Sequence, residues 1–119
     1  MRRLLLLAAL GLATAGCGTH GASGPRLRPK IGQDLLAQAK RVETLLEDGK
    51  PCAAAGAAAS LQTETIALIN RGLVQPRLQE PLLAKVNGTA GSALCVKGRK
   101  PPPHARERVR DLRAWLEAH

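Results

Sequence analysis

The most reactive side chains in this sequence belong to its three cysteines, Cys17, Cys52 and Cys95. Thiols can pair into a disulfide, bind a metal or accept a covalent group, and their surroundings decide which. The sequence contains no C-x-x-C motif. The histidines lie outside the apolar helical stretches, at His20, His104 and His119. This spacing predicts no metal site and leaves pairing and covalent modification as the chemistry of the thiols.

Cys17 closes a segment that is typical of an export signal. Arg2 and Arg3 precede an apolar run from Leu4 to Ala15. A run of about 12 residues is too short to span a bilayer as a finished helix. We therefore expect residues 1–16 to be a signal peptide and the rest of the chain to lie outside the cytoplasm.

The sequence Thr14-Ala15-Gly16-Cys17 resembles the lipobox of bacterial lipoproteins. The resemblance implies a diacylglyceryl group on Cys17, cleavage before it, and a lipid anchor on the extracytoplasmic face of the cell membrane. The family usually has Leu where this chain has Thr14. Two alternatives stay open: cleavage after Ala15, which would release a soluble protein, and a cytoplasmic protein with an apolar N-terminal helix.

Residues 17–30 are expected to be a flexible tether. The segment is rich in Gly, Pro and polar residues and has no apolar periodicity. Arg26, Arg28 and Lys30 would lie near the membrane, where basic side chains are attracted to anionic phospholipid.

Residues 31–96 are expected to form a small three-helix bundle, so the predicted fold class is all-α. Apolar residues recur at helical spacing in three stretches, 32–48, 51–71 and 81–95. Gly49 and Gly72 are expected to end the first two helices. Residues 73–80 are expected to be a connector, because Pro81 would remove a backbone hydrogen bond inside a helix.

Cys52 and Cys95 fall at the start of the second expected helix and the end of the third. If these helices are antiparallel the two sulfurs meet, and lipid modification of Cys17 would leave them as a pair. A core without Phe or Tyr is marginal at this size. In the loop-entropy account, a disulfide over this span would stabilise the fold by about 4 kcal/mol.

The C-terminal part has a different composition. Residues 97–103 form a basic, Pro-rich linker, and its three consecutive prolines exclude a continuous helix. Residues 104–119 are expected to form a short amphipathic helix with Val109, Leu112, Trp115 and Leu116 on one side. This helix either packs on the bundle or is available for binding.

The balance of charge suggests an anionic partner. Without the signal, the chain keeps 16 of its 18 Lys and Arg residues, compared with 9 Asp and Glu residues. A basic amphipathic helix can bind an anionic membrane or an acidic polymer of the cell envelope. The candidate binding residues are Lys97, Arg99, Lys100, Arg106, Arg108, Arg110 and Arg113. Three observations argue against nucleic acid as a partner: the export signal, the scarcity of aromatic residues and the lack of a known nucleic-acid-binding motif.

The sequence does not assemble a catalytic site. No serine lies in a G-x-S-x-G motif, and no histidine lies in the expected bundle to act as a base. We therefore expect no catalytic residue, no cofactor and no metal.

Two functions remain. The first is a non-catalytic interaction or structural lipoprotein of the cell envelope that meets a protein partner through a helix face. The second is a binding module for anionic envelope material, with residues 97–119 as its contact surface. The cysteine pair and short helices resemble the small helical lipoproteins of high-GC bacteria, whose roles are mostly undefined.

Overall fold

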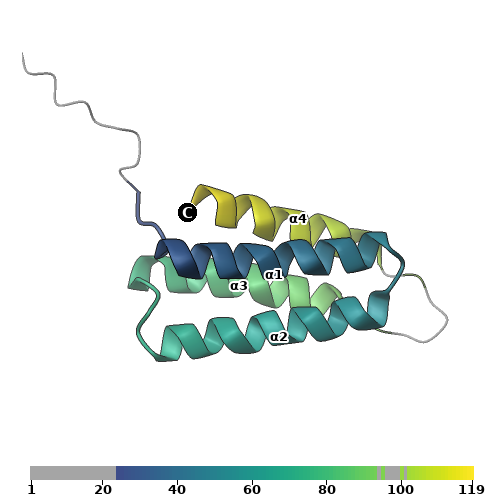
Figure 1. The fold of residues 1–119 in the computed structure, drawn as a ribbon, viewed down its shortest axis with the longest axis horizontal. Helices are drawn as coiled ribbons and strands as arrows, with labels where there is room; N and C mark the ends of the chain where they lie inside the picture. The colour runs from purple at the N-terminus through teal and green to yellow at the C-terminus, as the bar shows by residue number, and fades with distance from the viewer. Residues whose placement is uncertain (1–23, 94, 96–99, 101) are drawn as a thin grey trace, which may run out of the picture.

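The computed structural model describes residues 24–93, 95, 100 and 102–119, which form an antiparallel four-helix bundle (Figure 1). The helices are α1 (Pro29–Glu47), α2 (Pro51–Asn70), α3 (Pro76–Ser92) and α4 (Pro103–Ala118). Helix α1 packs on α2 and α4, and α3 packs on the same two helices. The four helices therefore close a ring around a common core, and the all-α prediction is confirmed.

The helix ends follow from proline and glycine. A proline occupies the first turn of every helix, where the N–H that it lacks would have no partner within the helix. Gly49 and Gly72 follow α1 and α2 with φ angles of 69° and 71°, which favour glycine. At the end of α2, Leu73 N–H donates to the Leu68 carbonyl and Gly72 N–H donates to the Ile69 carbonyl. This paired arrangement caps the last carbonyls of the helix.

The core consists of two apolar clusters stacked along the bundle. The first lies toward the start of α1 and is rich in leucine, including Leu35, Leu61, Leu82 and Leu112. The second lies toward the opposite end and contains mainly alanine and valine. Its members are Val42, Leu46, Ala54, Ala58, Ala93, Ala105 and Val109. Small side chains bury less apolar area, so hydrophobic burial stabilises this second end less than the first.

Helix α3 begins at Pro76, so the expected connector over 73–80 and the expected start at Pro81 are wrong. The leucine at position 78 is 2% exposed and continues the buried stripe of Leu82 and Val86. Pro81 lies inside α3 and cannot donate to the carbonyl four residues before it. Burial of Leu78 contributes about 2 kcal/mol and so offsets much of the cost of the interior proline, which is about 3 kcal/mol.

Helix α4 completes the bundle as its fourth helix, which is one of the two placements that the sequence left open for residues 104–119. It packs against both α1 and α3. The side chains of Val109 and Leu112 are fully buried, and Leu116 is 5% exposed. Most of the expected linker, 97–103, lies outside the described residues.

The folded part also begins earlier than the expected tether allowed. Leu27 is buried, and its N–H donates to the carbonyl oxygen of His119 at 2.7 Å. Helix α1 starts at Pro29, so the tether cannot extend to Lys30. Residues 1–23, which include the expected signal and Cys17, lie outside the described residues.

Helix α2 is the one described helix with the length and mean hydropathy, 1.2, that would allow it to cross a membrane. Much of its hydropathy comes from alanine. The helix packs on α1 and α3, and it contributes Ala54, Ala58 and Leu61 to the core. Helix α2 is thus an integral helix of the bundle.

Candidate functional site

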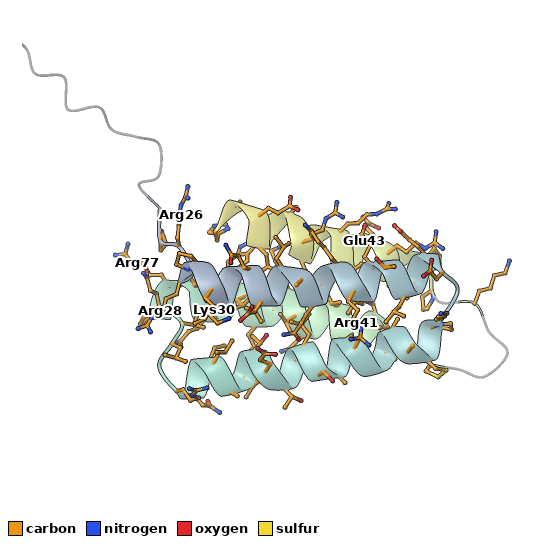
Figure 2. All side chains as sticks on the ribbon, in the orientation of Figure 1. Arg26, Arg28, Lys30, Arg41, Glu43 and Arg77 are labelled. Carbon is orange, nitrogen blue, oxygen red and sulfur yellow. A yellow bond between two sulfur atoms is a disulfide. The ribbon has the colours of Figure 1, made fainter. Side chains whose placement is uncertain are left out.

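The disulfide predicted from the sequence is present. Cys52, in the first turn of α2, is bonded to Cys95, which follows α3, and their Cα atoms lie 4.6 Å apart. Both residues are exposed. The bond lies at the end of the bundle with the alanine-rich cluster (Figure 2). A covalent link therefore ties α2 to the segment after α3 where apolar burial is weakest.

The basic residues proposed for anionic binding have different surroundings in the structure. Lys97 and Arg99 lie outside the described residues, and Lys100 is exposed. Arg106 and Arg108 are exposed on α4, although Arg106 Nη2 also lies 3.5 Å from the Leu46 carbonyl oxygen.

The other two candidates, Arg110 and Arg113, face α1 and contact Glu43. Arg113 Nη1 lies 2.7 Å from Glu43 Oε2, and Arg110 Nε lies 3.5 Å from Oε1 of the same carboxylate. The Glu43 side chain is only 8% exposed, whereas the side chain of Arg113 is 38% exposed and that of Arg110 is 58% exposed. Glu47 and Glu117 lie 3.8 Å from Arg110 and 3.7 Å from Arg113, respectively.

These ion pairs change how the basic helix should be interpreted. The charges of Arg110 and Arg113 are balanced by carboxylates on α1 and α4, so these residues help to hold α4 on α1. On the other side of α4, Lys85 of α3 pairs with Asp111 at 2.7 Å. The basic surface that α4 offers to an external partner is therefore formed mainly by Arg106 and Arg108, with Lys100 before the helix.

Sequence reasoning missed Glu43, although the pattern contained a signal for it. Ala39, Val42 and Leu46 form the buried stripe of α1, and position 43 lies on the same face at helical spacing. An acidic residue at such a position requires a partner when it is buried. Arginines in a neighbouring amphipathic helix are suitable partners.

The described residues bring together no cluster of potential metal ligands. Among residues 24–93, 95, 100 and 102–119, no three His, Cys, Asp or Glu side chains gather closely enough to hold a metal ion. A shallow hollow of about 500 Å³ lies between α1 and α2. It is lined by Gln38, Arg41, Ala53, Gly56, Ala57 and Ser60, and its lining contains neither a carboxylate nor a histidine.

When the chain is compared with protein-family models, with curated proteins and with solved structures, nothing matches.

Proposed function

We propose that this protein is a lipoprotein of the bacterial cell envelope, anchored by a lipid on Cys17 to the extracytoplasmic face of the membrane. Its helical domain acts as a non-catalytic interaction or structural module. The pairing of the cysteines carries the proposal. Cys52 and Cys95 form a disulfide, and Cys17 is the thiol outside this pair. Disulfides persist in oxidising compartments outside the cytoplasm, which supports export.

The arrangement of the chain around Cys17 supports the same proposal. The apolar run before Cys17 matches an export signal, and the first buried residue of the bundle, Leu27, follows shortly after it. A lipid on Cys17 would therefore hold a folded domain next to the membrane. The surfaces of that domain are helix faces, which suit contact with another macromolecule better than chemistry on a small substrate.

The intact mass of the protein from the membrane fraction tests the anchor, measured before and after reduction and thiol alkylation. We expect a chain that lacks residues 1–16, carries a diacylglyceryl adduct and exposes two thiols only after reduction. The Cys17→Ser variant should lose the adduct, whereas Cys52→Ser with Cys95→Ser should retain it. A chain beginning at Gly16 with a free thiol at Cys17 would mean a released protein. An uncut chain with three free thiols would mean a cytoplasmic one.

A second candidate function is binding of anionic envelope polymer through α4 and the segment before it. It is favoured by the exposure of Lys100, Arg106 and Arg108, none of which forms an ion pair with another described residue. Heparin is a suitable polyanion probe. Arg106→Gln with Arg108→Gln should elute from immobilised heparin at lower salt, because each lost contact weakens a salt-dependent attraction.

Lys40→Gln with Arg41→Gln is the matched control for this second candidate function, because it removes the same amount of charge from the side of α1. Both side chains are exposed and distant in sequence from α4. Equal elution of the two double variants would mean that net charge alone governs binding, and the α4 surface would then be rejected.

A further inference from the structure

One end of the bundle gathers basic side chains that are far apart in the sequence. The antiparallel order brings the starts of α1 and α3 and the ends of α2 and α4 to this end. Arg26 and Arg28 precede α1 and Lys30 lies in its first turn, while Arg71 caps α2 and Arg77 lies in the first turn of α3. We call these five residues the basic end. All five are exposed, and the four labelled in Figure 2 lie together there.

The two segments that carry these residues lie against each other. The stretch Arg26–Arg28 and the turn Gly72–Pro76 line one shallow hollow of about 260 Å³. Arg71 and Arg77 immediately flank that turn. The hydrogen bond from Leu27 N–H to the His119 carbonyl fixes the first segment on the bundle. The basic end is therefore a surface of the fold and not a property of the tether.

Acidic side chains offset only part of this charge, since Asp34, Glu80 and Glu117 lie within two turns of the same helix ends. Lys30 pairs with Asp34 at 3.4 Å, and Glu117 at the end of α4 pairs with Arg113. The four arginines of the basic end form no ion pair with any other described residue. Their charges therefore remain available to an external anion.

This end is also the one that a lipid on Cys17 would hold at the membrane. Only residues 18–23 separate Cys17 from Gly24, the first described residue. Even fully extended, the stretch from Cys17 to Gly24 spans no more than about 25 Å. The start of α1 thus stays within reach of the headgroups, whereas the disulfide lies at the opposite end of the helices.

We propose that the basic end binds anionic phospholipid headgroups, so that the bundle stands on the membrane with its disulfide end pointing away. The orientation in the cell rests on the proposed lipid anchor, but the affinity of the surface does not. A basic side chain near an anionic surface contributes roughly fivefold in partition, the equivalent of about 1 kcal/mol. The attraction decays over about one Debye length. Arg71 and Arg77 reinforce the basic residues that precede α1.

Vesicle binding of the mature chain, residues 17–119 with Cys17→Ser, tests the surface without the lipid. This chain contains all four helices and both core clusters. We expect it to sediment with mixed phosphatidylglycerol and phosphatidylcholine vesicles at low salt, but not at high salt and not with pure phosphatidylcholine. Adding Arg71→Gln and Arg77→Gln should weaken partition into the anionic vesicles by roughly twentyfold, because two basic contacts are lost and each contributes about fivefold.

The control variant, Lys40→Gln with Arg41→Gln, removes equal charge from the side of α1. It should weaken partition by less than about threefold, because that side lies farther from the bilayer. Equal losses in the two variants, or no binding to the anionic vesicles, would overturn the proposal. A larger loss in Arg106→Gln with Arg108→Gln would also overturn it and assign membrane binding to α4. All substituted residues are exposed, and helical circular dichroism checks that each variant is folded.

The two proposals fail separately. A chain that binds anionic vesicles through Arg71 and Arg77 but carries no adduct on Cys17 would refute the anchor and keep the surface. If the native protein is lipidated but its unlipidated form does not bind anionic vesicles, the proposed lipid anchor stands and headgroup binding by the basic end is refuted.

Discussion

The Glu43 carboxylate is a buried acidic group between α1 and α4 that contacts two arginines. It is nearly inaccessible to water and lies 2.7 Å from the Arg113 guanidinium. A buried carboxylate needs charged or hydrogen-bonding partners to offset its lost hydration. Arg113 and Arg110 supply them, and both remain partly hydrated themselves. Loss of the arginines would therefore leave the carboxylate buried without partners, whereas the arginines would still be hydrated without the carboxylate.

Replacing Glu43 tests this dependence. We expect Glu43→Gln to lower the free energy of unfolding by about 1–2 kcal/mol, because the amide hydrogen-bonds Arg113 without balancing its charge. Glu47→Gln should change it by less than about 0.5 kcal/mol, since the pair of Glu47 with Arg110 is solvent-exposed. Urea unfolding followed by the fluorescence of Trp115 measures both. Similar losses in the two variants would contradict the special role of position 43.

At the scale of residues, the sequence predicted the disulfide but not the ion pairs. Cys52 and Cys95 could be paired because few cysteines compete and both lie near expected helix ends. Glu43 could not be paired in the same way. Which arginines of 104–119 face α1 depends on the rotation of α4, and this rotation is set by packing between elements distant in the sequence.

Among the helices, α3 shows how packing overrides a local signal. Its sixth residue, Pro81, disfavours a continuous helix, yet the helix passes through it. The first turn is held by the buried side chain of Leu78 and by a hydrogen bond from Gln79 Nε2 to the Val74 carbonyl oxygen. The result is a helix that is continuous but lacks one backbone hydrogen bond.

Removing the interior proline should stabilise the protein. We expect Pro81→Ala to raise the free energy of unfolding by about 1 kcal/mol. The regained hydrogen bond and better helix propensity outweigh the greater flexibility of the unfolded chain. Pro76→Ala, at the first helical position, is the matched control and should be neutral or slightly destabilising. A destabilised Pro81→Ala variant, measured by urea unfolding, would show that the proline ring itself contributes to packing.

The helix boundaries show what local sequence can and cannot predict. The ends of α1 and α2 were predicted within one residue, because Gly49 and Gly72 act through their own backbone conformation. The start of α3 was missed by five residues, between Pro76 and Pro81. It depends on whether Leu78 finds a core to enter, and that is decided by the other helices.

For the whole molecule, the bundle is a ring in which every helix needs both neighbours. Helix α4 fills the gap between α1 and α3 with Ala105, Val109, Leu112 and Leu116, all buried. Without α4, the apolar faces of α1 and α3 would be open to water. We therefore expect that α1, α2 and α3 do not form a stable bundle without α4.

Deletion of α4 should abolish cooperative folding. We expect the chain truncated after position 102 to lose most of its helical circular dichroism at 222 nm and to unfold without a sigmoidal transition. The milder Val109→Ala change should retain the fold and cost about 1–3 kcal/mol. A truncated chain with native helicity would contradict the closed ring. Because truncation is expected to unfold the domain, point substitutions are the proper test of binding by α4.

Loss of the disulfide should affect stability without changing the architecture. The bond closes a sequence separation of 43 residues. Cys52→Ser with Cys95→Ser is expected to lower the free energy of unfolding by up to about 4 kcal/mol, because the unfolded chain regains freedom. Amide hydrogen exchange should quicken first around the alanine-rich cluster. Unchanged stability after reduction would mean that core packing alone holds that end.

The closed ring also has a consequence for the time at which the protein can fold. The contacts between α1 and α4 join the first and last of the four described helices, and the Arg113–Glu43 pair spans 70 positions. As the ribosome adds residues, the buried face of α1 has no complete partner until α4 emerges. We therefore expect the four-helix bundle to close only after α4 has been synthesised. Such late closure of the bundle would suit the proposed export, in which the chain passes through a membrane channel before it folds.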